Sequence, residues 1–233
     1  MPTSILALIF GFLVVVLAFM RQRLVYELSG ASLLLLGSTK PGIWLYTLFF
    51  LPGTIIHELS HWLVAEILQV KTGEIKIFPD WEDEGGTRRL GSVATAKSDP
   101  LRGFLIGIAP FVTGLLILTI LGELLSRGWG VFYPWQTGSI IYGIIVIGNS
   151  MMISEADRRT WPFIFFFLAL ISIVIYRMQP TISPSLSLLA SNTLSKLDLV
   201  LGVTAGLNLV MIGGLYLLRV LSERISGKRI SHK

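Results

Sequence analysis

The stretch from residue 43 to residue 69, IWLYTLFFLPGTIIHELSHWLVAEILQ, decides what kind of fold the chain adopts. It is apolar along most of its length, and it exceeds the roughly 20 residues that an α-helix needs to cross a bilayer. His57, Glu58 and His61 nevertheless fall within it. Ionisable side chains are costly at membrane depth and usually functional there, so the stretch predicts both a transmembrane helix and a functional site.

The composition of the whole chain also indicates a membrane protein. Of its 233 residues 53% are hydrophobic and 14% charged, with a mean hydropathy of +0.73, whereas a soluble domain needs more polar surface. The length allows one domain, residues 1–233, with a core at about 43–177. The N-terminus lacks a basic region and a small-residue cleavage site, which favours a retained span over a signal peptide.

Seven apolar segments predict an all-α polytopic membrane protein with six or seven transmembrane helices. They are residues 4–20, 24–39, 43–69, 103–126, 137–153, 161–177 and 198–219. Segment 24–39 is short and contains Glu27, so a half-helix or a re-entrant piece is an alternative there. The serine-rich residues 178–197 are expected to form a loop on the outer side.

The 19 Lys and Arg residues are unevenly divided between the two sides of this layout. Seven spans would place 15 of them on one side, and the remaining four, Lys40, Arg127, Arg177 and Lys196, on the other. The richer side is expected to be cytoplasmic, in a prokaryotic cell membrane. The net charge of +5 and the basic tail 220–233 are explained by contact with anionic headgroups, and no nucleic-acid partner is expected.

A short β-hairpin is expected at the cytoplasmic face, in residues 73–96. The stretch Gly73–Phe78 alternates like a strand, and Gly91–Ala96 is a second candidate strand. A turn-like acidic segment separates the two.

His57-Glu58-Leu59-Ser60-His61 is the strongest chemical signal. Residues four apart share one helix face, so two imidazoles can hold one zinc ion, and the adjacent Glu58 suits a general base. Zinc lowers the pKa of a bound water to about 7, and a carboxylate can then take its proton. The chain has no cysteine, so any metal must be held by histidines and carboxylates.

A third protein ligand must be a carboxylate, because His232, the remaining histidine, lies in the C-terminal tail. Asp157 is the best candidate, since it follows the fifth apolar segment at the membrane face toward which the His57 helix runs. Glu155 would point in nearly the opposite direction on a helix, so only one of the two can ligate. An ion pair of Asp157 with the two arginines after it is the alternative.

Three other carboxylates fit the ligand role less well. Glu66 lies five residues past His61, about 140° around a helix. Glu123 falls at the opposite membrane face. Glu27 is on the correct side and stays open as an alternative, but Arg23 precedes it by four residues and offers an ordinary ion pair.

Two further features accompany the motif. Pro52 predicts a break or kink, after which Thr54 could cap a new helical start. Asn149 lies in a span eight residues before Asp157. Its amide could hold a substrate carbonyl or oxyanion, or else form a helix–helix hydrogen bond.

With these residues the sequence resembles the site-2 protease family of intramembrane zinc metalloproteases. His57, Glu58 and His61 match the family's first motif, and Asn149 through Asp157 resemble its second, which implies that Asp157 is a zinc ligand. The hairpin and the Ala109-Pro110 step also fit the family, over residues 50–160 of the chain.

The resemblance implies zinc-dependent cleavage of peptide bonds in or near the spans of membrane proteins, including single-pass proteins and signal-peptide remnants. An extended substrate could pair with the strand edge near Ser92 and Val93. A transporter that handles metal ions or protons, and an inactive protease-like scaffold, are the alternatives. The absence of repeated halves argues against the first, and the intact Glu58 against the second. The oligomeric state stays open.

Overall fold

The computed structural model describes residues 2–78, 92–96, 98–128, 130–152 and 183–226. This part of the chain is mostly helical, with a small two-stranded sheet. The elements are α1 (Thr3–Leu36), α2 (Lys40–Ile67), β1 (Thr72–Lys76), β2 (Ser92–Thr95), α3 (Pro100–Gly128), α4 (Pro134–Ser150) and α6 (Pro184–Ser226).

Within the described residues, four helices are long and apolar enough to cross a membrane, namely α1, α2, α3 and α6. Helix α4 has 17 residues. At about 1.5 Å per residue it is about 26 Å long, somewhat less than the roughly 30 Å of a hydrocarbon core. The described part of the chain therefore contains fewer candidate spans than the expected six or seven. The predicted span 161–177 lies outside the described residues.

The expected separation of residues 4–20 from residues 24–39 is wrong, because α1 runs through both without a break. The basic residues at 21 and 23 predict a loop, but they find partners inside the protein. Arg23 Nη2 lies 2.6 Å from Oε1 of Glu27, and Arg21 donates to the carbonyl of Met152 at 3.4 Å. Charges that are paired in this way can be accommodated within a continuous helix.

The expected loop 178–197 is also wrong over its described part, because α6 begins at Pro184. Proline is favoured in the first turn of a helix, because the backbone N–H groups there have no acceptor within the helix and the missing N–H costs no hydrogen bond. The serines that indicated a loop bond back to their own helix. Ser187 donates to the carbonyl of Pro184 at 2.8 Å, and Ser191 to that of Leu188 at 2.9 Å.

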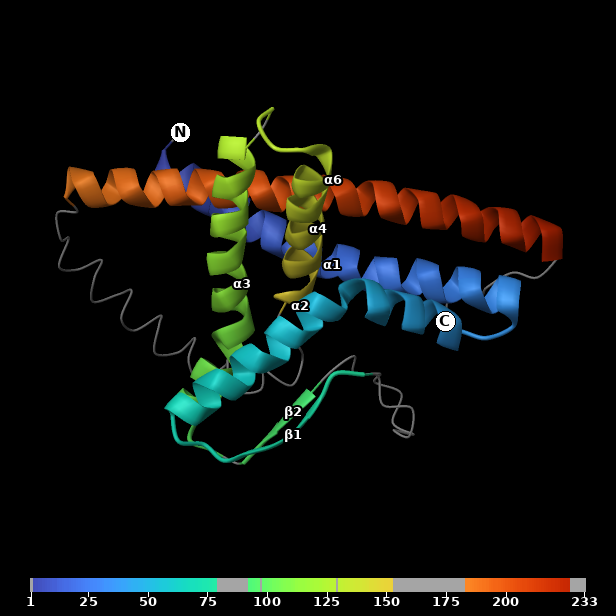
Figure 1. The fold of residues 1–233 in the computed structure, drawn as a ribbon, viewed down its shortest axis with the longest axis horizontal. Helices are drawn as coiled ribbons and strands as arrows, with labels where there is room; N and C mark the ends of the chain where they lie inside the picture. The colour runs from blue at the N-terminus through green and yellow to red at the C-terminus, as the bar shows by residue number, and fades with distance from the viewer. Residues whose placement is uncertain (1, 79–91, 97, 129, 153–182, 227–233) are drawn as a thin grey trace.

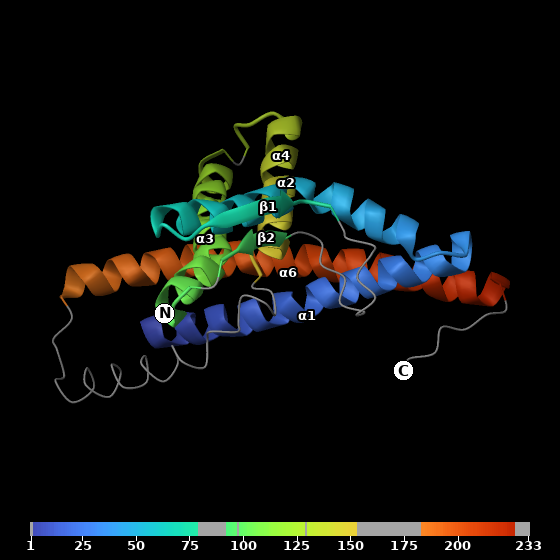
Figure 2. The same ribbon diagram turned by 90° about the horizontal axis from the view of Figure 1, so that it is seen from below.

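The two longest helices, α1 and α6, lie side by side and run in the same direction (Figure 1). Helices α3 and α4 cross them in this view, and α2 leads back from the end of α1 toward α3. Figure 2 shows the same arrangement from below. The main core lies where α1, α3, α4 and α6 meet, around Leu17, Leu118, Ile144 and Leu201, each fully buried. Apolar side chains such as Leu8 and Phe12 of α1 face outward, as expected for a surface in contact with lipid.

Glycines allow the helices to approach one another closely. A Cβ on Gly114 of α3 would lie 2.4 Å from the Cβ of Met151, and a Cβ on Gly148 of α4 would lie 2.8 Å from Cγ2 of Thr204. A Cβ on Gly42 of α2 would lie 2.6 Å from the carbonyl oxygen of Leu28. Small residues at helix contacts are typical of packing within membranes, where van der Waals contact replaces the hydrophobic effect.

Pro52 lies inside α2, which remains one helix but changes direction part-way along (Figure 1). The predicted kink is present, whereas the alternative of a new start capped by Thr54 is not, because Thr54 donates to the carbonyl of Phe50 one turn back. Tyr142 of α4 donates to the carbonyl of Phe49 at 2.7 Å. Backbone carbonyls that a proline disturbs can take side-chain donors from a neighbouring helix in this way.

The sheet consists of β1 and β2, which pair antiparallel where the hairpin is expected. Ile75 lies opposite Val93 and Lys76 opposite Ser92, with an irregularity between Thr72 and Ile75. Both strands contact α2. The expected acidic turn lies outside the described residues.

Candidate active site

His57 and His61 project from α2 and each is fixed by one backbone carbonyl of another helix. Nδ1 of His57 is 2.6 Å from the carbonyl oxygen of Ser150 in α4, and Nδ1 of His61 is 2.8 Å from that of Ile106 in α3. A carbonyl oxygen only accepts, so each Nδ1 carries the proton and donates. A neutral imidazole in this tautomer has its lone pair on Nε2, the atom that can ligate a metal.

The two accepting carbonyls share a property, because each lies where its own helix cannot supply the usual donor. The helical partner of the Ile106 carbonyl would be the N–H of residue 110, which is a proline. Ser150 is the last residue of α4, where the final carbonyls have no intrahelical donor. The protein thus orients both histidines with acceptors that helix geometry leaves available.

The spacing of the two rings fits a shared metal ion. Their centroids are 4.9 Å apart and their planes are inclined by 83°. Two imidazoles bound through Nε2 to one tetrahedral zinc, at about 2.1 Å, would have centroids about 5 Å apart. The two histidines therefore fit the metal that the sequence predicts.

Glu58 and His61 are buried, whereas His57 is only partly buried. Glu58 follows His57 directly, so it projects from α2 within one turn of both imidazoles. Ionisable side chains within membrane spans are costly and are usually functional. The arrangement provides two nitrogen ligands and a neighbouring proton acceptor in one turn of helix.

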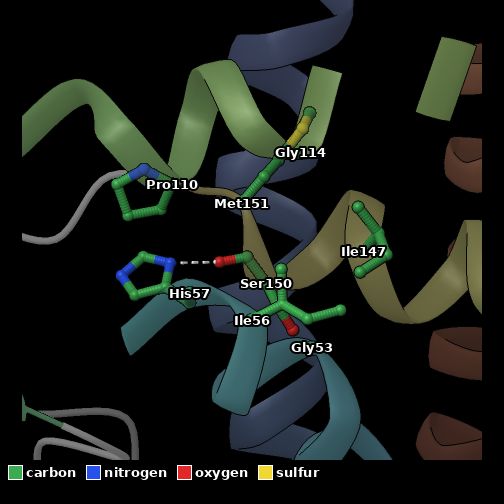
Figure 3. Close-up of a pocket in the computed structure, with 8 residues that line it drawn as sticks. All are labelled: Gly53, Ile56, His57, Pro110, Gly114, Ile147, Ser150 and Met151. Carbon is green, nitrogen blue, oxygen red and sulfur yellow. Dashed lines mark hydrogen bonds between the residues drawn. The ribbon is translucent and has the colours of Figure 1, made fainter. Parts of the chain in front are cut away.

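A small pocket adjoins His57 where three helices meet (Figure 3). Gly53, Ile56 and His57 come from α2, Pro110 and Gly114 from α3, and Ile147, Ser150 and the adjoining Met151 from the end of α4. The open volume is about 10 Å³, close to the space that one water molecule needs. Figure 3 shows the His57 ring bonded to the Ser150 carbonyl, with Pro110 across the pocket.

Helices α2 and α4 meet in a regular ladder of three contacts, which we call the α2–α4 ladder. Tyr142 bonds the carbonyl of Phe49, Val146 packs on Gly53, and the Ser150 carbonyl accepts from His57. In each pair the two residues are 93 positions apart, so both helices advance by four residues from rung to rung. Residues four apart form one ridge of a helix, and the last rung of the ridge is the candidate site.

Asn149 is almost fully buried and forms the helix–helix hydrogen bond that the sequence left as one of two alternatives. Its Nδ2 donates to Oδ1 of Asn208 at 3.0 Å, and Nδ2 of Asn208 donates to Oδ1 of Asn149 at 2.8 Å. Nδ2 of Asn149 also lies 2.8 Å from the carbonyl oxygen of Ile145. A role for Asn149 in binding substrate stays a prediction.

The described residues do not bring a carboxylate to the two histidines as a third metal ligand. Asp157 and Glu155, the favoured candidates, lie outside the described residues. Glu27 forms the expected ion pair with Arg23 and also accepts from Arg219 Nε at 2.6 Å. It is therefore committed to α1 and α6 in this structure.

Two other carboxylates also have partners away from the histidines. Glu66 accepts from the hydroxyl of Thr72 at 2.9 Å, and Glu123 pairs with Arg127 and Lys196. Both were expected to be poor ligands.

Ser92 and Val93, the predicted substrate-binding residues, lie on β2 and pair with Lys76 and Ile75 of β1. In a two-stranded sheet only one edge of β2 is taken by β1. The predicted pairing of an extended substrate with the other edge stays a prediction.

Sequence reasoning missed the groups that orient the histidines. The Ile106 carbonyl had a signal, since Pro110 follows it by four residues and removes its donor. The sequence signal for the Ser150 carbonyl was weaker, because that carbonyl lacks a helical donor only if α4 ends at Ser150. No sequence signal identified Asn208, because a polar residue in an apolar helix has many possible partners.

Comparison with known proteins identifies no relative. No family model, no curated protein and no solved structure matches this chain. The function therefore rests on the site itself.

Proposed function

We propose that this chain is an intramembrane zinc metallopeptidase that hydrolyses peptide bonds in or near the transmembrane segments of other membrane proteins. His57, His61 and Asp157 would hold the zinc ion, and Glu58 would act as the general base. The substrate class would be single-pass proteins or remnants of signal peptides. The protein would lie in a prokaryotic cell membrane, with the site toward the cytoplasm.

One observation carries the proposal, namely that both imidazoles of the motif donate Nδ1–H to carbonyls of two different helices. Two histidines on one face of a helix, each with Nδ1–H bonded to a carbonyl and its lone pair on Nε2, are typical of metal ligands held by outer partners. The adjacent buried Glu58 supports a hydrolytic role over simple metal storage.

The position of α4 supports Asp157 as the third ligand. The Ser150 carbonyl lies at hydrogen-bond distance from His57, and Asp157 follows Ser150 by seven residues in the sequence. The end of α4, after which the sequence continues to Asp157, therefore lies at the candidate site. Glu155, two residues earlier, shares this argument and stays the alternative.

The residues of the chain have separable roles in the proposed reaction. A zinc ion would supply Lewis acidity and lower the pKa of water at the site. Glu58 would take a proton from the water that attacks the scissile carbonyl and would deliver it to the departing amine. The buried surroundings of Glu58 and His61 would limit access of bulk water. Hydrolysis would leave one new carboxylate and one new amine.

Glu58→Gln tests the proposal most directly. The variant should retain zinc, because the three ligands remain, and should cleave at least about 100-fold more slowly, because an amide cannot take the proton. Zinc content would be measured on purified protein, and cleavage on a fluorogenic single-span peptide reconstituted with it in vesicles. Glu66→Gln, on the same helix but bonded to Thr72, is the matched control and should cleave like wild type.

Other outcomes would contradict the proposal in different ways. Normal cleavage by Glu58→Gln would exclude Glu58 as the base. Wild-type protein that binds zinc and conducts it across vesicles without cleaving any peptide would favour a transporter. Loss of zinc in Asp157→Ala but not in Glu155→Ala would identify the third ligand, and the reverse result would replace Asp157 by Glu155.

A further inference from the structure

The amide pair Asn149–Asn208 is buried deep in the protein. The exposed fraction is 1% for Asn149 and 0% for Asn208. The two side chains exchange hydrogen bonds of 2.8 and 3.0 Å between α4 and α6. A reciprocal amide pair fixes both the distance and the mutual orientation of two helices, because both bonds are lost if either helix slides or rotates.

This pair lies next to the carbonyl that orients His57. Asn149 directly precedes Ser150, whose carbonyl oxygen is 2.6 Å from Nδ1 of His57. Ser150 is the last residue of α4, and the carbonyls at the end of a helix are not held in direction by intrahelical bonds. The position of this carbonyl therefore depends on how the end of α4 is anchored to its neighbours.

Helix α6 provides that anchor at two adjacent residues of α4. Besides the amide pair, Gly148 allows Thr204 to approach so closely that an added Cβ would meet Cγ2 at 2.8 Å. Thr204 and Asn208 are four apart and so lie on one face of α6. Of these contacts the amide pair is the directional one, since packing alone tolerates small shifts.

His61 provides a contrast within the same site. Its Nδ1 donates to the carbonyl of Ile106, which lies within α3 and not at its C-terminal end. The acceptor for His61 is therefore set by α3, whereas the acceptor for His57 is set by the end of α4. A disturbance of the contact between α4 and α6 should reach His57 and leave His61 in place.

We propose that Asn208 is a positioning residue that, through Asn149 and the Ser150 carbonyl, holds the imidazole of His57 in its ligating orientation. The effect on His57 does not require a metal. The consequence for zinc affinity rests on the proposed function.

The first test compares Asn208→Ala with wild type in metal-free protein. With ¹⁵N-labelled histidine, NMR would follow the hydrogen exchange of each Nδ1–H. Exchange at His57 should become at least about tenfold faster, because its acceptor loses its anchor, while exchange at His61 stays within about twofold of wild type. Ser222→Ala is the matched control and should change neither, since it removes a buried hydroxyl that, among the described residues, bonds the Leu218 carbonyl of its own helix. Equal changes at both histidines, or none, would overturn the proposal.

The second test measures zinc affinity by competition with a chelator. Asn208→Ala should bind zinc about tenfold more weakly, in the range seen when outer partners of ligating histidines are removed. Wild type that binds no zinc would contradict the proposed function, while the exchange measurement would still decide the role of Asn208. Zinc affinity unchanged in Asn208→Ala would contradict the positioning role.

A double variant separates positioning from stability. In Asn149→Leu/Asn208→Leu both amides are replaced by apolar groups of similar size, which can leave stability nearly unchanged because no buried polar group is left unpaired. The proposal expects thermal stability near that of wild type with zinc binding still about tenfold weaker. Recovery of affinity together with stability would show that the pair only supports packing, and would overturn the proposal.

Discussion

The α2–α4 ladder and the contact between α1 and α6 join pairs of helices by different means. The ladder uses a glycine, two backbone carbonyls and one histidine, with no ion pair among its rungs. The second contact contains a charged cluster, in which Arg219 bonds Glu27 at 2.6 Å and Glu223 at 2.7 Å. We call these three residues together with Arg23 the α1–α6 cluster.

The difference separates two kinds of sensitivity. The ladder holds the candidate site through close backbone approach, so it should respond to added volume. The α1–α6 cluster holds two long helices through paired charges, so it should respond to the loss of one charge and tolerate changes of shape. Added volume should therefore have little effect in the α1–α6 cluster, and loss of a charge should have little effect on the α2–α4 ladder.

Arg219→Met should give the largest effect on stability. The side chain of Glu27 is 0% exposed, and without Arg219 it would retain only Arg23 as an ion-pair partner among the described residues. Breaking a buried ion pair on one side costs about 3–5 kcal/mol. The free energy of unfolding in detergent should fall accordingly, while zinc affinity stays unchanged. A loss of zinc with stability intact would instead make Glu27 a ligand candidate again.

Gly53→Ala should give the next largest effect, and it should reach the metal. Its Cβ would lie 2.7 Å from the Cβ of Ser150 and 2.8 Å from Cγ1 of Val146, so α2 and α4 must move apart. Overpacking of this kind costs about 1–3 kcal/mol. Zinc affinity, measured by chelator competition, should fall as the Ser150 carbonyl moves away from His57.

Gly213→Ala is the matched control for Gly53→Ala. Gly213 lies in α6, and a Cβ there meets nothing within 4 Å among the described residues. Alanine in place of a helical glycine should raise stability by about 0.5–1 kcal/mol and leave zinc affinity unchanged. Equal destabilisation by the two substitutions would show that close approach is not what distinguishes Gly53.

Tyr142→Phe should give the smallest loss of stability, because it removes only the hydrogen bond to Phe49 at the far end of the ladder. The ring can keep its edge-on contact with the Phe49 ring, 5.4 Å away between centroids. Loss of one such bond costs about 1 kcal/mol. A small decrease in thermal stability with near-normal cleavage is expected, and a loss of cleavage as large as that of Glu58→Gln would assign Tyr142 a catalytic role.

Local features of the structure could be predicted from the sequence. The spacing of His57 and His61 places both imidazoles on one face of a single helix, as observed. The Arg23–Glu27 ion pair and the two strands near residues 73–96 follow from patterns only a few residues long. Each of these depends on residues that lie close together in the sequence.

The helix boundaries could not be predicted where polar residues have distant partners. The pair Arg21 and Arg23 is typical of a loop between two apolar segments, and the acceptor of Arg21, the carbonyl of Met152, lies 131 positions away in the sequence. The serines at the start of α6 resembled a loop because their hydroxyls can bond either to water or to the helix backbone. A distant contact decided the first case, and bonding of the hydroxyls to their own helix decided the second.

The orientation of the site was the least predictable part. It depends on the carbonyls of Ser150 and Ile106, which every residue type possesses. Only Pro110 marks one of them in the sequence. The pairing of Asn149 with Asn208 spans 59 positions, and neither residue alone identifies the other.

The constant step of four residues in the α2–α4 ladder makes the length of α2 between Phe49 and His57 a fixed quantity. One inserted residue would turn everything beyond it by about 100° and advance it by about 1.5 Å, which would carry the histidine off the Ser150 carbonyl. One deleted residue would do the same in the opposite sense. The ladder therefore constrains the number of residues between Phe49 and His57 as well as the size of the side chain at Gly53.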